Sequence, residues 1–343
     1  MKVAVYYNNR DIRIEERPVP SLKQGELLIK VHSASVCGSD VMEWYRVEKI
    51  GRVLGHEIAG EVVEVGVGVK IYKKGDRVAA SHHVPCYQCH YCRLGNHTLC
   101  NTLKTTNFDP GGFSQLIRLP EINVRYGVYR LPDHVSYEEG TFIEPLACVV
   151  RGQRKANVRP GQTVLIIGSG ISGLLHLLLA RAKGVDRIIT VDIDESRLKT
   201  AKDFGADQVW HAQEDIGKRL LELNENRLAD VVIVCSGATS SIGQALDCVG
   251  LGGTVLFFAL VGPDCVVPMA MNRIFWQKGA TLMNSYAASP EDHHESLELI
   301  GTGIVPVKKM ITHRLPFDRI GEGFQLVAEA KKSLKVIIDP TRG

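Results

Sequence analysis

A glycine-rich turn between a strand and a helix is the feature of this chain that most restricts its fold. The apolar run Thr163–Ile167 predicts a buried strand, and Gly168, Gly170 and Gly173 follow it in a GxGxxG pattern. Leucines then recur at helical spacing over residues 171–183, so a helix begins at the turn. Strand–turn–helix segments of this kind belong to βαβ units, which build parallel sheets.

The rest of the chain divides into two kinds of pattern. Up to about residue 130, short alternating strand patterns broken by Gly, Pro and Asn indicate a β-rich domain. From about residue 160, apolar strands alternate with helical segments, which indicates a parallel sheet covered by helices. The later predicted elements are strands over 187–192, 229–235, 253–260 and 335–338, a helix from Asp194 and a helical stretch over 296–300. At 343 residues the chain is long enough for two domains.

The three glycines fit a dinucleotide-binding turn. The first permits the tight turn, the second lets the backbone approach a pyrophosphate, and the third lets the helix pack closely on the strand. The helix that opens with Ile171 and Ser172 also directs its amino end at the negative charge. Alone, the motif could equally be a glycine-rich turn between two core elements.

The strand after this helix supplies the second observation. It ends in Asp192, near the spacing at which a carboxylate accepts a hydrogen bond from the ribose 2′-hydroxyl. A carboxylate there would repel a 2′-phosphate, so the sequence predicts NAD rather than NADP. Capping of the next helix is the other role for Asp192, and Asp194 is available for that role. Arg197 is then expected to lie beside the ribose or to contact solvent.

Four of the nine cysteines lie close together and predict a metal site. Cys86, Cys89, Cys92 and Cys100 follow a C-x2-C-x2-C-x7-C spacing. Four thiolates can surround one tetrahedral zinc and leave no position for a substrate. An iron–sulfur cluster is the alternative, since soft thiolates bind both. We expect a structural site that holds a loop which cannot bury a core of its own.

The charge balance gives no reason to expect a polyanionic partner. The chain has 41 basic and 38 acidic residues without a long block of like charge, which disfavours nucleic acid and anionic membranes as partners. No apolar segment of signal-peptide length stands at the N-terminus. The long apolar stretch over residues 164–180 is interrupted by the glycines of the turn and does not suit a membrane helix. The odd number of cysteines also argues against a disulfide framework, so we expect a cytoplasmic protein.

A second set of candidate metal ligands is spread along the first half of the chain. Cys37 lies in Cys-Gly-Ser-Asp, His56 and Glu57 lie in Gly-His-Glu-x-x-Gly-x5-Gly, and Glu144 lies in Glu-Pro-Leu. Each one alone has an ordinary structural explanation, as a small buried cysteine, a hydrogen-bonded histidine or a helix-terminal charge. In this order, and together with the four-cysteine lobe and the glycine turn, they resemble the zinc-containing medium-chain alcohol dehydrogenases. The similarity extends over essentially the whole chain and is greatest to the sorbitol and polyol branch, with the threonine dehydrogenases close.

This resemblance implies a catalytic zinc in addition to the structural one. Cys37 and His56 match its ligands, and Glu57 and Glu144 match two acidic positions that bind the zinc directly or through water in the polyol branch. In liver-type alcohol dehydrogenases a cysteine stands at the position of Glu144. Cys148 lies four residues too late for that role, so the resemblance favours Glu144.

Three further positions near Cys37 take their meaning from the same resemblance. Ser39 matches the hydroxyl that accepts the proton of the substrate alcohol before a hydride passes to the nicotinamide, and Asp40 matches the acid that orients the ligand histidine. Met42 stands where many relatives have a histidine that passes the proton outward, which weakens sorbitol as the specific substrate. Residues 44–46 either line the substrate pocket or pack in the core.

The resemblance implies the following organisation and activity. A GroES-like catalytic domain, residues 1–151 and 289–343 with the structural zinc lobe at 86–100, surrounds a Rossmann NAD-binding domain, residues 152–288. The expected enzyme is a homotetramer or homodimer that oxidises a polyol, sugar alcohol or cyclitol with NAD and two zinc ions per subunit. The alternatives are an L-threonine 3-dehydrogenase, a simple secondary-alcohol dehydrogenase, a zinc-free quinone reductase, and a catalytically silent binding protein on the same fold.

Overall fold

The computed structural model describes residues 1–331 and 333–343. The chain forms two compact units, one from residues 1–147 and 287–343 and the other from residues 148–286. We call them the catalytic unit and the nucleotide unit. Among the described residues, no helix is both long and apolar enough to cross a membrane.

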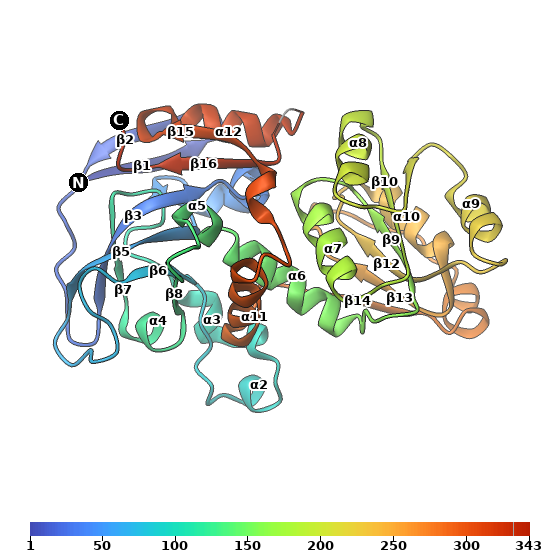
Figure 1. Cartoon of the computed structure of the whole chain (residues 1–343), viewed down its shortest axis with the longest axis horizontal. Helices are drawn as coiled ribbons and strands as arrows, with labels where there is room; N and C mark the ends of the chain where they lie inside the picture. The colour runs from blue at the N-terminus through green and yellow to red at the C-terminus, as the bar shows by residue number, and fades with distance from the viewer. Residues whose placement is uncertain (332) are drawn as a thin grey trace. The chain divides into compact units, whose positions relative to one another are not determined.

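The nucleotide unit contains a six-stranded parallel sheet (Figure 1). Its strands are β9 (Thr163–Ile167), β10 (Arg187–Asp192), β11 (Gln208–His211), β12 (Ala229–Val234), β13 (Val249–Phe257) and β14 (Thr281–Asn284). Their spatial order is β11-β10-β9-β12-β13-β14, the order of a dinucleotide-binding sheet. The predicted doubly wound parallel sheet is therefore confirmed, and its topological switch point lies between β9 and β12.

Helices cover both faces of this sheet because the order in which strands are added reverses at the switch point. In Figure 1, α7 (Ile171–Ala182) and α8 (Glu195–Asp203) lie on one side of the strands, and α9 (Ile216–Leu223) and α10 (Thr239–Cys248) lie on the other. All five residues of β9 are buried, as expected for a central strand with both faces covered.

The catalytic unit is built mainly from antiparallel strands. Its larger sheet has the order β15-β16-β3-β5-β6-β8, with β7 also paired to β3, and a three-stranded sheet has the order β2-β1-β4. The strands are β1 (Lys2–Asn8), β2 (Asp11–Glu16), β3 (Leu27–Ser35), β4 (Arg52–Val53), β5 (Glu57–Val65), β6 (Arg77–Ala80), β7 (Leu116–Leu119), β8 (Val128–Arg130), β15 (Ile311–Pro316) and β16 (Lys335–Asp339). This confirms the predicted β-rich domain.

Short helices connect these strands, and longer ones follow in the C-terminal part of the unit. They are α1 (Glu43–Arg46), α2 (His90–Arg93), α3 (Asn101–Thr105), α4 (Glu121–Tyr126), α5 (Tyr137–Gly140), α11 (Pro290–Gly301) and α12 (Ile320–Glu329). Helix α6 (Ile143–Lys155) contains the residue at which the chain passes from one unit to the other. The stretch predicted over 296–300 is the end of α11, whereas β15 and α12 were not predicted.

Candidate metal centres and dinucleotide site

Three of the dispersed candidate ligands come together in the catalytic unit. Ligand atoms of Cys37, His56 and Glu57 all lie within 4.8 Å of one another. Cys37 follows the end of β3, and His56 and Glu57 stand at the start of β5. Because β3 and β5 are antiparallel neighbours, with Ser35 opposite Glu57, the end of one strand meets the beginning of the other. A thiolate, an imidazole and a carboxylate so close together suit a zinc ion that keeps a fourth position open.

Glu144 is placed differently from the other three predicted ligands. It is half-buried in the first turn of α6. Among the described residues, the close group of ligand atoms contains Cys37, His56 and Glu57 but not Glu144. The geometry of the described chain thus supports three protein ligands.

A buried carboxylate orients the histidine of this group. Asp40 is fully buried, and its Oδ1 lies 3.4 Å from His56 Nδ1. The backbone N–H of Cys37 donates to Asp40 Oδ2 over 3.1 Å. Burial by itself would raise the pKa of Asp40, but the charges of His56 and Arg46 and the hydrogen bonds hold that pKa below its usual value. The contact at Nδ1 leaves His56 Nε2 for a metal, the arrangement usual for ligand histidines.

An arginine that no motif identified holds the same loop together. Arg46 donates from Nε to the backbone oxygen of Ser39 over 2.8 Å and from Nη2 to Ser39 Oγ over 3.0 Å. The same Nη2 lies 3.2 Å from Asp40 Oδ1. Ser39 Oγ in turn lies 3.4 Å from Cys37 Sγ. The neighbouring Trp44 and Tyr45 are exposed, so of the three residues 44–46 only the arginine contacts the metal-site loop through these bonds.

Two donors from different strands hold the carboxylate of Glu57. Ser35 Oγ and Lys335 Nζ each lie 2.5 Å from Glu57 Oε2. All three residues are buried. Lys335 was not singled out from the sequence, although a lysine that begins a strand of buried apolar residues is a signal that could have identified it.

A pair of histidines beside the metal-site group was also missed. The His82 ring lies 5.0 Å from the His56 ring, between centroids, and stacks on His83 at 3.7 Å. Burial lowers the pKa of His83 to about 3 and that of His82 well below its usual value, so both rings are neutral. They follow β6, which pairs with β5, and sheet pairing therefore brings them beside His56.

The four cysteines of the predicted lobe also lie together. Their sulfur atoms are all within 4.8 Å of one another, around the short helices α2 and α3. Backbone N–H groups of Gln88 and Cys89 point at Cys86 Sγ over 3.4 and 3.3 Å. Backbone donors lower the pKa of Cys100 to about 6 against the opposing effect of burial. Four sulfurs with N–H donors around them fit a closed tetrahedral zinc site.

The glycine turn of the nucleotide unit has the geometry its motif requires. Gly168 adopts a φ of 102°, which favours glycine. A Cβ on Gly173 would lie only 1.9 Å from the backbone oxygen of Gly168, so the third glycine is needed for close packing. Gly170, the residue before α7, makes no side-chain cap, which leaves the first N–H groups of the helix available to an anion.

Asp192 lies at the end of β10 beside this turn. It accepts from the backbone N–H of Ser169 over 2.7 Å and from that of Asp194 over 3.0 Å. The cap of α8 is Asp194, which accepts from the N–H groups of Ser196 and Arg197. Arg197 Nη1 lies 3.9 Å from Asp192 Oδ2. Asp192 is therefore fixed at the turn and is not the helix cap.

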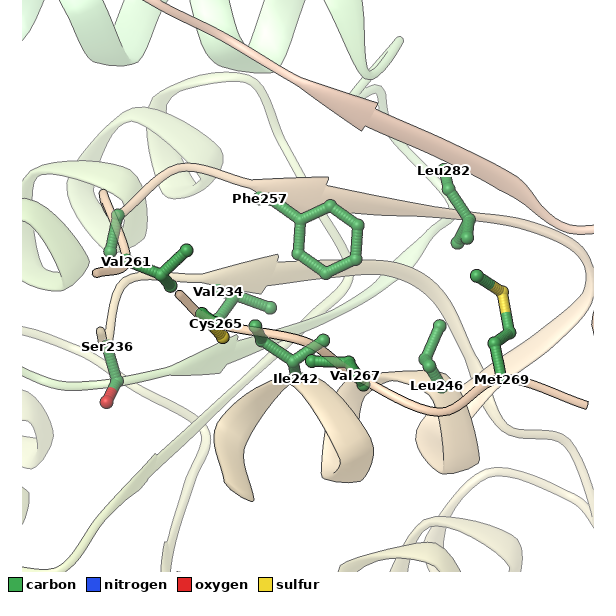
Figure 2. A pocket seen from close by; sticks show the side chains of 11 residues that line it. Val234, Ser236, Ile242, Leu246, Phe257, Val261, Cys265, Val267, Met269 and Leu282 are labelled. Atoms are coloured by element: carbon green, nitrogen blue, oxygen red, sulfur yellow. The ribbon is translucent and has the colours of Figure 1, made fainter. Parts of the chain in front are cut away.

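An apolar pocket of about 360 Å³ lies elsewhere in the nucleotide unit (Figure 2). It opens between α10 and the strands β12 and β13, with Phe257, Leu282 and Met269 among its lining side chains. Ser236 and Cys265 supply its only polar side-chain atoms among the lining residues. This lining has no charged group and does not suit a metal ion or a pyrophosphate.

Comparisons with known proteins identify the family of this chain. Residues 23–133 match the alcohol dehydrogenase GroES-like domain, and residues 172–302 match the zinc-binding dehydrogenase family. The chain is 31% identical to a sorbitol dehydrogenase of Bacillus subtilis, over 100% of this chain and 98% of that protein. It is 33% identical to the sorbitol dehydrogenase of Ovis aries, over 98% and 96%. The structure of 2R,3R-butanediol dehydrogenase from Bacillus subtilis superposes with a TM-score of 0.85 at 25% identity and covers 99% of each chain.

The chain belongs to the zinc-binding medium-chain alcohol dehydrogenase family. This confirms the predicted combination of a GroES-like domain with a Rossmann domain, and the predicted class of enzyme, an oxidoreductase.

Proposed function

We propose that this enzyme oxidises a secondary alcohol of a polyol with NAD, at a zinc ion held by Cys37, His56 and Glu57. The observation that carries the proposal is the meeting of these three ligands, two of them from one sequence motif, in a chain whose full-length relatives act on sorbitol. A bound zinc would lower the pKa of the substrate alcohol, and a bound NAD would take the hydride. The chain's own residues bind and orient these groups and provide a route for the proton.

Ser39 is the residue we assign to the substrate proton. Its hydroxyl lies next to Cys37 Sγ and accepts a hydrogen bond from Arg46, so its own hydrogen is directed away from the arginine. Arg46 cannot take a proton onward, because a guanidinium stays protonated in proteins. Met42 has no titratable group either. We infer that the proton leaves Ser39 through water, without a histidine at position 42.

Glu144 is proposed as an occasional or water-mediated ligand rather than as one of the three direct ones. Its separation from the close ligand group supports this ranking. We propose the four cysteines as the ligands of a structural zinc, since a fully thiolate site leaves no open position.

NAD is proposed as the cofactor, bound at Gly168, Gly170 and Gly173 with the amino end of α7 at the pyrophosphate. Asp192 supports NAD because its carboxylate already stands beside the turn, held by two backbone donors. Lone pairs of its oxygens remain for a ribose hydroxyl, whereas a 2′-phosphate would be repelled. The guanidinium of Arg197 lies 3.9 Å from this carboxylate.

For the organisation of the whole protein we keep the proposal made from the sequence. We propose residues 1–151 and 289–343 as the catalytic domain and 152–288 as the NAD-binding domain, which the two compact units support to within a few residues. The homotetramer or homodimer and the cytoplasmic location stay predictions.

A substrate panel and metal analysis test the proposed function together. Formation of NADH is measured with sorbitol, xylitol, inositol, butanediol and threonine, and zinc is counted per subunit. We expect turnover of a polyol and two zinc ions, with Cys37→Ser losing one zinc and the activity. Turnover of threonine but of no polyol would move the enzyme to the threonine branch. Unchanged turnover of the Cys37→Ser variant would overturn the assignment of the catalytic centre.

A further inference from the structure

Lys335 is a buried lysine whose ammonium group is directed at a proposed metal ligand. Its side chain is 2% exposed and that of Glu57 is 1% exposed. Nζ of Lys335 lies 2.5 Å from Glu57 Oε2 and 5.2 Å from the centroid of the Phe142 ring. Lysines are almost never fully buried unless they are paired, and the Glu57 carboxylate is the partner of this one.

Strand pairing explains how residues so far apart in sequence meet. Strand β16, which begins with Lys335, pairs with the end of β3, where Ile337 lies opposite Ser35. Strand β3 also pairs with β5, where Ser35 lies opposite Glu57. The central strand thus places Ser35 and the first residue of β16 on the same side of the Glu57 carboxylate.

Both donors use the same carboxylate oxygen. Ser35 Oγ and Lys335 Nζ each bond to Oε2. A carboxylate has two oxygens. Because both donors bond to Oε2, Oε1 is the oxygen that can bind a metal beside Cys37 and His56.

We propose that Lys335 is a positioning residue of the metal centre: it holds the Glu57 carboxylate turned so that Oε1 faces the metal. This inference rests on the proposed function, because it takes Glu57 as a ligand. Without the ammonium, Oε2 keeps only the Ser35 hydroxyl as a donor, so the carboxylate is held less firmly in this orientation. The ammonium also repels a metal cation, but the carboxylate lies between the two charges and screens that repulsion.

Metal binding to the Lys335→Met variant tests this role. The metal-free enzyme is reloaded with Zn²⁺ or Co²⁺, and metal affinity is measured by competition with a chelator. The visible spectrum of Co²⁺ reports the ligands at the Cys37 site. We expect the variant to bind metal at this site about 10–100-fold more weakly, as for other residues that orient a ligand. The four-cysteine site should keep its metal, which serves as an internal control for folding.

Two further variants separate a positioning role from a general structural one. Lys335→Arg keeps a buried cation and should restore most of the affinity. In a Glu57→Gln background, Lys335→Met should change the affinity little, since its effect passes through the carboxylate. If Lys335→Met does not accumulate as folded protein, Lys335→Gln replaces it, because its polar amide suits a buried position but is one atom shorter than the lysine side chain and does not reach Oε2 as the ammonium does.

Three results would overturn the inference. The first is unaltered metal affinity and Co²⁺ spectrum in folded Lys335→Met or Lys335→Gln, and the second is an equal loss with and without Glu57. The third is a Lys335→Arg variant as weak as the methionine variant. Failure of the proposed function can be told apart from failure of this inference by the wild-type enzyme. If the proposed zinc site is wrong, the wild-type enzyme holds no metal at Cys37 and gives no Co²⁺ spectrum from a thiolate–imidazole site.

Discussion

Replacement of His176 by leucine should make the nucleotide unit less sensitive to acid. His176 lies on α7, the helix that begins at the glycine turn, and has no exposed surface. Its ring meets Phe258 edge-on at 4.5 Å, and its Nδ1 lies 3.3 Å from the amide nitrogen of Gln153. An amide donor and an apolar ring stabilise a neutral imidazole. Burial accordingly lowers the pKa of His176 from 6.5 to about 3.

The sign and size of the effect follow from that pKa. The unfolded chain protonates this histidine at about pH 6.5, whereas the folded chain does so only near pH 3. The unfolded state therefore binds more protons in this range, and the free energy of unfolding falls as the pH drops below 6.5. For this single group the loss is about 2 kcal/mol between neutral pH and pH 5.

Urea unfolding of the full-length protein at a series of pH values measures how much His176 contributes to the pH dependence of the free energy of unfolding. Trp210 is buried in the core of the same unit, so its fluorescence reports the unfolding of that unit. The leucine variant keeps the bond from Gln153 Nε2 to the backbone oxygen at position 176. We compare the slopes of the free energy of unfolding against pH, since altered packing in the variant shifts that free energy by the same amount at every pH. Parallel curves for wild type and His176→Leu between pH 7.5 and 5 would refute the reasoning.

Three other changes probe the proposed sites. Asp192→Ala should raise the KM for NAD about tenfold to a hundredfold, because the ribose loses a charged hydrogen-bond acceptor, and should narrow the preference for NAD over NADP. An unchanged ratio of the KM for NAD to the KM for NADP would show that Asp192 does not bind the ribose. Arg46→Met should lower kcat about 10–100-fold with a smaller change in KM, since Ser39 and Asp40 lose a shared donor. Arg46→Lys should restore only part of kcat, because lysine lacks the planar fork of the guanidinium. Wild-type kcat in both variants would contradict this role. Cys100→Ser should lose one zinc per subunit and lower the Tm, as metal analysis and calorimetry would reveal, whereas retention of both zinc ions would argue against the four-cysteine site.

The nucleotide unit was largely predictable because its signals are local. The strand over 187–192 matches β10 residue for residue, and the helix predicted from Ile171 ends one residue early, at Ala182. Strand β13 begins at Val249, four residues before the predicted start, since Gly250, Gly252 and Gly253 interrupt the apolar pattern at its beginning. Glycines weaken the strand pattern without preventing pairing when neighbouring strands fix the register.

Glycine residues also explain why helix α12 was not predicted from the sequence. Helix α12 carries Gly321 and Gly323 in its first turns, and glycine lowers helix propensity by about 1 kcal/mol. One of them packs closely on β16, since a Cβ on Gly323 would lie 3.0 Å from Ile338 Cδ1. The tertiary contact that stabilises the helix is thus the one that removes its sequence signal.

Sequence motifs contain the proposed metal ligands but not the residues that orient them. Two short motifs contain Cys37, His56 and Glu57, and the pairing of β3 with β5 brings these motifs together. The partner of Glu57 lies 278 residues away on the last strand, and only the pairing of β16 with β3 brings it close.

Each of the two proposed ligands at the start of β5 has its own buried partner. Asp40 holds His56, and Lys335 holds Glu57. The histidine is oriented from the loop next to Cys37, whereas the carboxylate is oriented from the end of the chain. A change in the packing of β16 can therefore alter the carboxylate ligand and leave the cysteine and histidine in place.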